Sequence, residues 1–200
     1  MIPEFRKNFN SHYSDQTYKN CIRELWNWTG GEEDFRVCET PLFIDQSLND
    51  SLVTASEDIV NFLSSNEFKE LSSGAVPDNL MVPNEDPHPL FLQIDFAITK
   101  DSSGNFIPKL IELQGFPSLY AFQGELDRLN RKYYAIPERF GTYFNGLDES
   151  SYFSLLQKAI LDEHKPENVV LLEIEPHKQK TRIDFYITEK KIGIKPVCIS

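Results

Sequence analysis

Two short segments with a regular alternation of apolar and polar residues constrain this chain most, because together they predict a β-hairpin. The first covers residues 90–98 and the second covers residues 108–114. In the first segment every even position is apolar, whereas Gln93 and Asp95 fall on the other side, as a period of two residues requires. Glu112 and Gln114 likewise share one side of the second segment. We therefore predict two antiparallel strands that carry polar side chains on one shared face.

The turn between these segments sets the expected register. Residues 101–105 read Asp-Ser-Ser-Gly-Asn, a composition typical of turns. A hairpin folded about residues 103 and 104 places Asp95 opposite Glu112 and Gln93 opposite Gln114, with Lys109 on the other face. Two carboxylates about 5 Å apart across a ladder repel each other, by about 1 kcal/mol in water and about 3 kcal/mol at an effective dielectric constant of 20. A bound cation would remove this cost, so the pair is a candidate metal site.

The charge and hydropathy of the chain argue against two classes of partner. Its 200 residues include 20 basic and 31 acidic side chains, a net charge of −11 that repels a phosphate backbone. No run approaches the roughly 18 apolar residues needed to span a bilayer, and the first residues lack the apolar core of a signal peptide. We expect a cytoplasmic protein with no nucleic-acid or membrane partner, and the oligomeric state stays open.

The cysteines and histidines predict neither a disulfide framework nor a zinc site. Cys21, Cys38 and Cys198 lie far apart and form no Cys-x-x-Cys pair. The four histidines show no His-Glu-x-x-His spacing. We expect the three cysteines to be reduced and mostly buried.

Helices are predicted on both sides of the hairpin. Apolar residues at spacings of three and four predict helices over residues 14–28, 51–71, 118–134, 150–164 and 177–190. In the helix over 118–134, Ser118 is the expected N-cap. Residues 77–89 contain four prolines and predict an irregular loop, because each proline removes a donor and restricts the residue before it.

The last part of the chain predicts a parallel pair of strands. Residues 168–174 form an apolar run typical of strands that are covered on both faces. With the helix over 177–190 and a strand over 196–199, they predict a right-handed βαβ crossover. Two parallel strands make a poor domain by themselves, so we expect that the sequence ends inside a domain. The predicted fold class is α/β, with α+β character in the N-terminal half. Its predicted domains are residues 1–147, helical with the hairpin at 90–114, and residues 148–200, the start of a truncated α/β unit.

The loop after the second strand of the hairpin provides a candidate phosphate site. Gly115 to Ser118 lie between the strand that carries Glu112 and the following helix. Their backbone N–H groups and the helix N-terminus could hold an anion near the carboxylates. A tight turn with no ligand explains the same residues equally well.

The side chains of the shared face suit a hard cation. Asp95, Glu112 and Gln114, with Gln93 beside them, offer oxygen ligands, and Mg²⁺ usually takes one or two carboxylates plus phosphate oxygens and water. Such a cation neutralises charge in phosphoryl transfer. No glycine-rich nucleotide loop and no Gly-x-Ser-x-Gly elbow occurs. A solvated polar face on an edge hairpin would give the same alternation, and a metal-dependent hydrolase would lack a base histidine nearby in sequence.

The order of these motifs resembles the metal-binding hairpin of glutathionylspermidine synthase-like proteins, in the circularly permuted branch of the ATP-grasp ligases. That family has Arg-x-Asp-Phe on one strand, Glu-x-Asn on the next, and then a loop of small residues. By this resemblance Asp95 and Glu112 correspond to magnesium ligands at the ATP phosphates, and Gln114 replaces the asparagine. Gln93 stands at the position of the arginine, and a neutral amide cannot supply the charge of a guanidinium. The resemblance covers residues 90–125, and residues 168–200 resemble the start of a pre-ATP-grasp unit.

The resemblance implies the N-terminal part of a ligase that joins a carboxylate to an amine or thiol through an acyl phosphate. Its cofactors would be Mg²⁺ and ATP, and its substrate a small carboxylate. Gln93 would orient a phosphate or substrate oxygen, and Gly115 and Ser118 would contact the nucleotide. We expect this chain to be inactive by itself, because the nucleotide-gripping lysines and the glycine-rich flap of the family do not occur in it. The alternative is a non-catalytic binding or interaction module derived from the same fold, which Gln93 favours.

Overall fold

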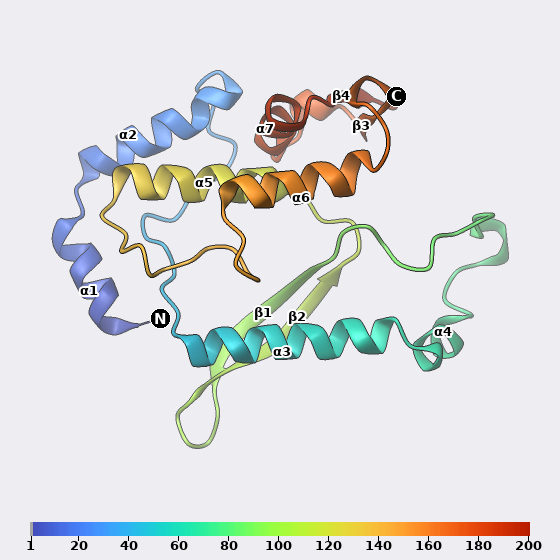
Figure 1. The fold of residues 1–200 in the computed structure, drawn as a ribbon, viewed down its shortest axis with the longest axis horizontal. Helices are drawn as coiled ribbons and strands as arrows, with labels where there is room; N and C mark the ends of the chain where they lie inside the picture. The colour runs from blue at the N-terminus through green and yellow to red at the C-terminus, as the bar shows by residue number, and fades with distance from the viewer. Residues whose placement is uncertain (1) are drawn as a thin grey trace. The chain divides into compact units, whose positions relative to one another are not determined.

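The computed structural model describes residues 2–200, which form a mixture of helices and short strands (Figure 1). Contacts divide these residues into two compact units. Unit 1 comprises residue 2 and residues 43–117, and unit 2 comprises residues 3–42 and 118–200. The predicted domain division after residue 147 is a different partition and stays a prediction. Across the described residues, no helix combines the length and the apolar composition that crossing a membrane requires.

Unit 1 contains two helices and the predicted hairpin. Its α-helices are α3 (Gln46–Leu63) and α4 (Asn66–Ser72), followed by the short 3-10 helix η2 (Asp78–Leu80). Strands β1 (Gln93–Lys100) and β2 (Phe106–Gln114) form an antiparallel two-stranded sheet, and α3 packs against β2. Among the described residues of this unit, the buried apolar side chains are Phe43 and Leu48. The hairpin prediction is therefore confirmed, on a unit with a small core.

The helix predicted over residues 51–71 is wrong in both its start and its continuity. It starts at Gln46, because the Asp45 carboxylate caps it by accepting the backbone N–H of Leu48 at 2.9 Å. It also breaks before α4, where the Ser65 hydroxyl accepts the backbone N–H of Phe68 at 3.1 Å and begins a new helix. The Asp45 cap thus sets the start of the first helix, and the Ser65 cap begins the second one.

The hairpin contains one irregularity that the alternation of residues does not reveal. Asp95 pairs with Glu112 and Gln93 pairs with Gln114, as predicted. Nearer the turn, however, the register differs by one residue: Phe96 pairs with Leu110, Ala97 with Lys109 and Lys100 with Phe106. Ile111 is the extra residue between the two registers, and a β-bulge absorbs it.

Unit 2 packs helices from both ends of the chain around one core. Its α-helices are α1 (Pro3–His12), α2 (Asp15–Trp26), α5 (Tyr120–Tyr133), α6 (Glu149–Leu161) and α7 (Arg182–Ile192). It also contains the short 3-10 helices η1 (Asn27–Thr29), η3 (Pro166–Asn168) and η4 (Pro176–Lys178). Helix α5 contacts α2, α6 and α7. The side chains at the centre are fully buried, among them Leu25, Trp26, Leu129, Ile183 and Ile187.

The predicted parallel pair is present in unit 2, but one prediction about it is wrong. Strands β3 (Val170–Glu173) and β4 (Lys195–Cys198) pair in parallel on either side of α7 in the sequence. Val170 is 56% exposed and Leu172 is 51% exposed, so the run is not covered on both faces by the described residues. Strand β3 has only β4 as a ladder partner in the described chain, and helix α7 contacts β4.

The prediction of mostly buried cysteines is also wrong. Cys21 is buried in α2, whereas Cys38 and Cys198 are exposed, and all three are free thiols. Burial raises the pKa of the Cys21 thiol to about 11. Cys38 lies in irregular chain and Cys198 ends a two-stranded sheet, and neither place offers a core in which to bury a side chain.

Candidate metal site on the hairpin

The predicted carboxylate pair converges on a single point. Asp95 on β1 and Glu112 on β2 are direct partners across the ladder. The amide nitrogen of Gln114 donates to Asp95 Oδ2 at 2.8 Å and to Glu112 Oε1 at 2.9 Å. One carboxylate oxygen from each strand therefore lies within hydrogen-bond distance of one atom. A positively polarised group already occupies the position where a cation would relieve the repulsion of the pair.

Gln93 supports this cluster from the neighbouring position on β1. Its amide nitrogen donates to Asp95 Oδ1 at 2.9 Å. The hydrogen bonds from Gln93 and then from Gln114 lower the pKa of Asp95 below its usual value. The structure thus brings together four of the predicted site residues, and it gives Gln93 a role in holding the Asp95 carboxylate.

The residues of the cluster fit a hard divalent cation. The nitrogen and oxygen of a glutamine amide are assigned from the hydrogen-bond network, and a half-turn of the Gln114 amide directs its oxygen toward the two carboxylates. Asp95, Glu112 and Gln114 would then supply three oxygen ligands of the kind that Mg²⁺ accepts. Glu112 is exposed and the other two are half-buried, so solvent reaches the set. Among the described residues, no group of three or more His, Cys, Asp and Glu side chains could hold a metal. Water or phosphate oxygens would have to complete the coordination.

Lys109 belongs to the carboxylate face, which corrects the prediction from the sequence. It pairs with Ala97, and Ala97 lies two residues from Asp95 on the same strand. Residues directly opposite each other share a face, and so do residues two apart on one strand. A strict period of two from Glu112 places Lys109 on the other face, but the bulge at Ile111 shifts the alternation by one residue. No sequence signal marks that bulge.

The helix N-terminus predicted to hold an anion is already capped from within unit 2. The Asp184 carboxylate of α7 accepts the backbone N–H of Leu119 at 3.0 Å and that of Phe122 at 2.8 Å. Ser118 is not the N-cap, so that prediction is wrong: Leu119 takes the position with a φ of +72° and makes no side-chain cap. Asp184 supplies the missing acceptor from a distant segment. Nucleotide contacts by Gly115, in unit 1, and by Ser118, in unit 2, stay predictions.

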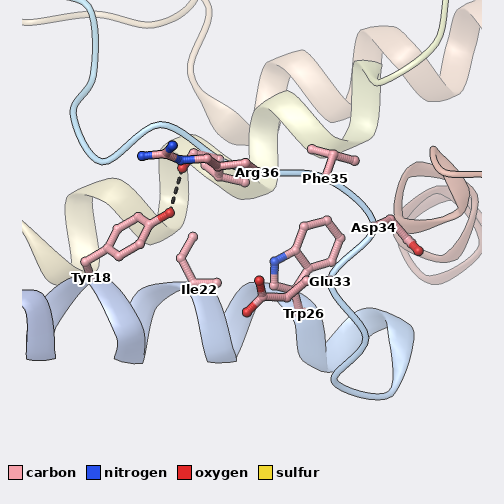
Figure 2. Close-up of a pocket in the computed structure, with 8 residues that line it drawn as sticks. Tyr18, Ile22, Trp26, Glu33, Asp34, Phe35 and Arg36 are labelled. Carbon is pink, nitrogen blue, oxygen red and sulfur yellow. Dashed lines mark hydrogen bonds between the residues drawn. The ribbon is translucent and has the colours of Figure 1, made fainter.

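A hollow of about 330 Å³ lies in unit 2 between α2 and the extended segment 33–37 (Figure 2). Tyr18, Ile22 and Trp26 line it from successive turns of α2, and Phe35 lines it from the segment. The Tyr18 hydroxyl donates to the Val37 carbonyl at 2.6 Å, the dashed line in Figure 2. Some of the polar groups that line this hollow bond to neighbouring residues, whereas Asp34 Oδ2 is buried without a hydrogen-bond partner in the described chain. Arg36 pairs with Glu39, and Asp34 pairs with Arg182 at 3.0 Å.

Comparisons with known proteins add no assignment. No family model, no curated protein and no solved structure gives a significant match to this chain. The resemblance to the glutathionylspermidine synthase-like family therefore depends on the motifs quoted from the sequence alone.

Proposed function

We propose that this chain is the metal-binding, N-terminal part of an ATP-grasp-like ligase that joins a small carboxylate to an amine or thiol at the expense of ATP. One observation carries the proposal. Asp95 and Glu112, from two paired strands, each have an oxygen within 2.9 Å of the same Gln114 amide nitrogen. Two ionised groups that converge in this way suit a divalent cation better than they suit each other.

Each residue of the cluster has a defined role in this proposal. Asp95 and Glu112 would hold Mg²⁺, and the Gln114 amide oxygen would complete the protein ligands. The ion would neutralise the charge that develops on the phosphates during formation of an acyl phosphate. Gln93 keeps the Asp95 carboxylate in position through its 2.9 Å hydrogen bond. The ligase class and its substrates come from the resemblance, the protein is expected in the cytoplasm, and this chain is expected to show no turnover by itself.

The proposal is tested by magnesium-dependent nucleotide binding to the full chain. We expect chemical shifts of the β1 and β2 amides to change on titration with ATP and Mg²⁺ together. Asp95→Asn should weaken this binding at least tenfold, because it removes one of the two charged ligands. The matched control is Glu57→Gln, which removes an exposed carboxylate of α3 in the same unit and should bind as wild type does. Equal titrations of wild type and Asp95→Asn would remove the metal site.

A second candidate function is a non-catalytic interaction module, which the other face of the hairpin favours. Ile98, Phe106 and Leu110 on that face are 37%, 43% and 51% exposed. Exposed apolar side chains of this kind mark interaction surfaces when they are contiguous. This function predicts that Leu110→Lys abolishes binding of a partner, whereas Asp95→Asn leaves it unchanged. The ligase proposal predicts instead that Asp95→Asn weakens nucleotide binding, whereas Leu110→Lys leaves it unchanged.

A further inference from the structure

Lys109 lies without a partner in the most acidic part of the chain. Residues 43–117 contain 12 acidic side chains and only three basic ones, Lys69, Lys100 and Lys109. Lys109 is exposed, and its side chain makes no hydrogen bond or ion pair within the described chain. An unpaired ammonium among so many carboxylates remains available to an incoming anion.

The register of the hairpin brings Lys109 toward the carboxylate pair. Its direct partner is Ala97, and Asp95 follows two residues further along β1, a distance of about 7 Å along the strand. Lys109 and Asp95 are therefore diagonal neighbours across the ladder, about 7–8 Å apart, and a long side chain spans that separation. Ala97 presents only a methyl group beside this path. The ammonium of Lys109 can therefore reach the region above the site where Asp95 and Glu112 would hold the cation.

The other polar groups of the hairpin cannot supply this charge. Gln93 is neutral, and its amide nitrogen is bonded to Asp95. Lys100 pairs with Phe106, and its ammonium lies over that ring at 5.3 Å from the centroid. Lys100 and Asp95 differ by an odd number of positions along β1, so they occupy opposite faces. Lys109 is the one basic side chain that the described hairpin places on the carboxylate face.

We propose that Lys109 is a phosphate-binding residue of this site, an inference that rests on the proposed function. In the complex, Asp95 and Glu112 would hold Mg²⁺, and the ion would contact phosphate oxygens of the nucleotide. The Lys109 ammonium would donate to a further phosphate oxygen, which carries a charge that the carboxylate-bound ion only partly neutralises. The site would thus contact the phosphates by two cationic groups on one face, the ion and the lysine.

The test compares three variants of the full chain in titrations with ATP and Mg²⁺ followed by chemical shifts. Lys109→Ala should weaken nucleotide binding about tenfold, and Lys109→Arg should retain binding within about threefold. Lys100→Ala removes the same charge from the other face of the same hairpin, so it should bind as wild type does. Because Lys109 is exposed, the loss in Lys109→Ala should shrink as salt is raised. Titration with adenosine, which has no phosphates, should not distinguish Lys109→Ala from wild type.

The outcomes separate this inference from the function on which it rests. If wild type binds the magnesium nucleotide and Asp95→Asn does not, but Lys109→Ala equals Lys100→Ala, the role of Lys109 is overturned and the metal site stands. If wild type shows no magnesium-dependent binding, the proposed function fails and the role of Lys109 fails with it. Thermal melting monitored by circular dichroism checks that each variant is folded. We expect the lysine variants to fold, because Lys100 and Lys109 are exposed.

Discussion

At the scale of single residues, the strongest electrostatic feature is a network of charges in unit 2. Glu24 of α2 accepts hydrogen bonds from Lys132 Nζ at 2.5 Å, Tyr133 Oη at 2.6 Å and Arg128 at 3.3 Å, all on α5. Arg128 also donates to Glu125, which is only 2% exposed, and this bond raises the pKa of Arg128. The network therefore fixes α2 against α5 by side chains that are partly withdrawn from water.

Because of this network, the stability of unit 2 should depend on pH. The hydrogen bonds from Lys132 and Tyr133 lower the pKa of Glu24 to about 2, from 4.5 for an unperturbed glutamate. A carboxyl with a depressed folded pKa contributes stability above pH 4.5 and loses that contribution as the pH falls toward 2. We expect Glu24→Gln to lower the free energy of unfolding by about 1–2 kcal/mol at pH 7 and by almost nothing near pH 2.

Urea unfolding at a series of pH values, followed by circular dichroism, checks this expectation. Glu33→Gln is the matched control, because it removes an exposed carboxylate from the same unit. A gap between Glu24→Gln and wild type that stayed constant from pH 7 to pH 2 would show that the network does not titrate through Glu24.

At the scale of secondary-structure elements, helix α5 depends on a cap that comes from α7. The Asp184 carboxylate is 7% exposed and accepts the N–H groups of Leu119 and Phe122 at the start of α5. Burial raises its pKa above the usual 3.8. Two elements far apart in the sequence are therefore joined by one buried acceptor, and neither element contains a substitute for it.

Two substitutions of Asp184 should separate its role as a hydrogen-bond acceptor from the effect of its charge. Asp184→Ala leaves the N–H groups of Leu119 and Phe122 without an acceptor, so we expect the free energy of unfolding to fall by about 2 kcal/mol. Asp184→Asn keeps an acceptor and should cost less than about 1 kcal/mol. Because the folded pKa is raised, wild type gains stability as the pH falls through that pKa toward 3.8, whereas the Asn variant does not.

Urea unfolding measures both effects, with Lys190→Ala on the exposed side of α7 as the control. An alanine variant as stable as that control would mean that water replaces the cap at no cost.

The same elements show how far the sequence predicts the fold. Local patterns carried enough information for the hairpin, because alternation and turn composition identify Asp95 and Glu112 as partners. They did not locate the bulge at Ile111, since an extra residue leaves no mark in the polarity pattern, and Lys109 was therefore assigned to the wrong face. They also missed the cap of α5, because Asp184 lies 65 positions from Leu119. Contacts between distant segments decide such features, and a period of two or of 3.6 residues cannot encode them.

At the scale of the whole molecule, the two compact units differ sharply in how much apolar surface they bury. Of the 16 buried apolar residues in the part of the chain that the structure describes, only Phe43 and Leu48 belong to unit 1. Unit 1 also carries 12 of the 31 acidic residues and only three of the 20 basic ones. A small core together with net negative charge predicts low local stability. The proposed metal site therefore lies on the unit whose structure has most to gain from a bound cation.

This contrast predicts a pattern of hydrogen exchange. Without ligand, backbone amides of β1 and β2 should exchange at least about tenfold faster than those of α5 and α7, because opening of the hairpin exposes little apolar surface. Addition of Mg²⁺ and ATP should slow exchange in the hairpin, since a ligand that binds only the folded form stabilises it by mass action. Exchange mass spectrometry on wild type and Asp95→Asn measures both effects, and the variant should show no slowing. Hairpin amides as well protected as those of α5 before any ligand is added would show that the few buried residues of unit 1 suffice to hold the site.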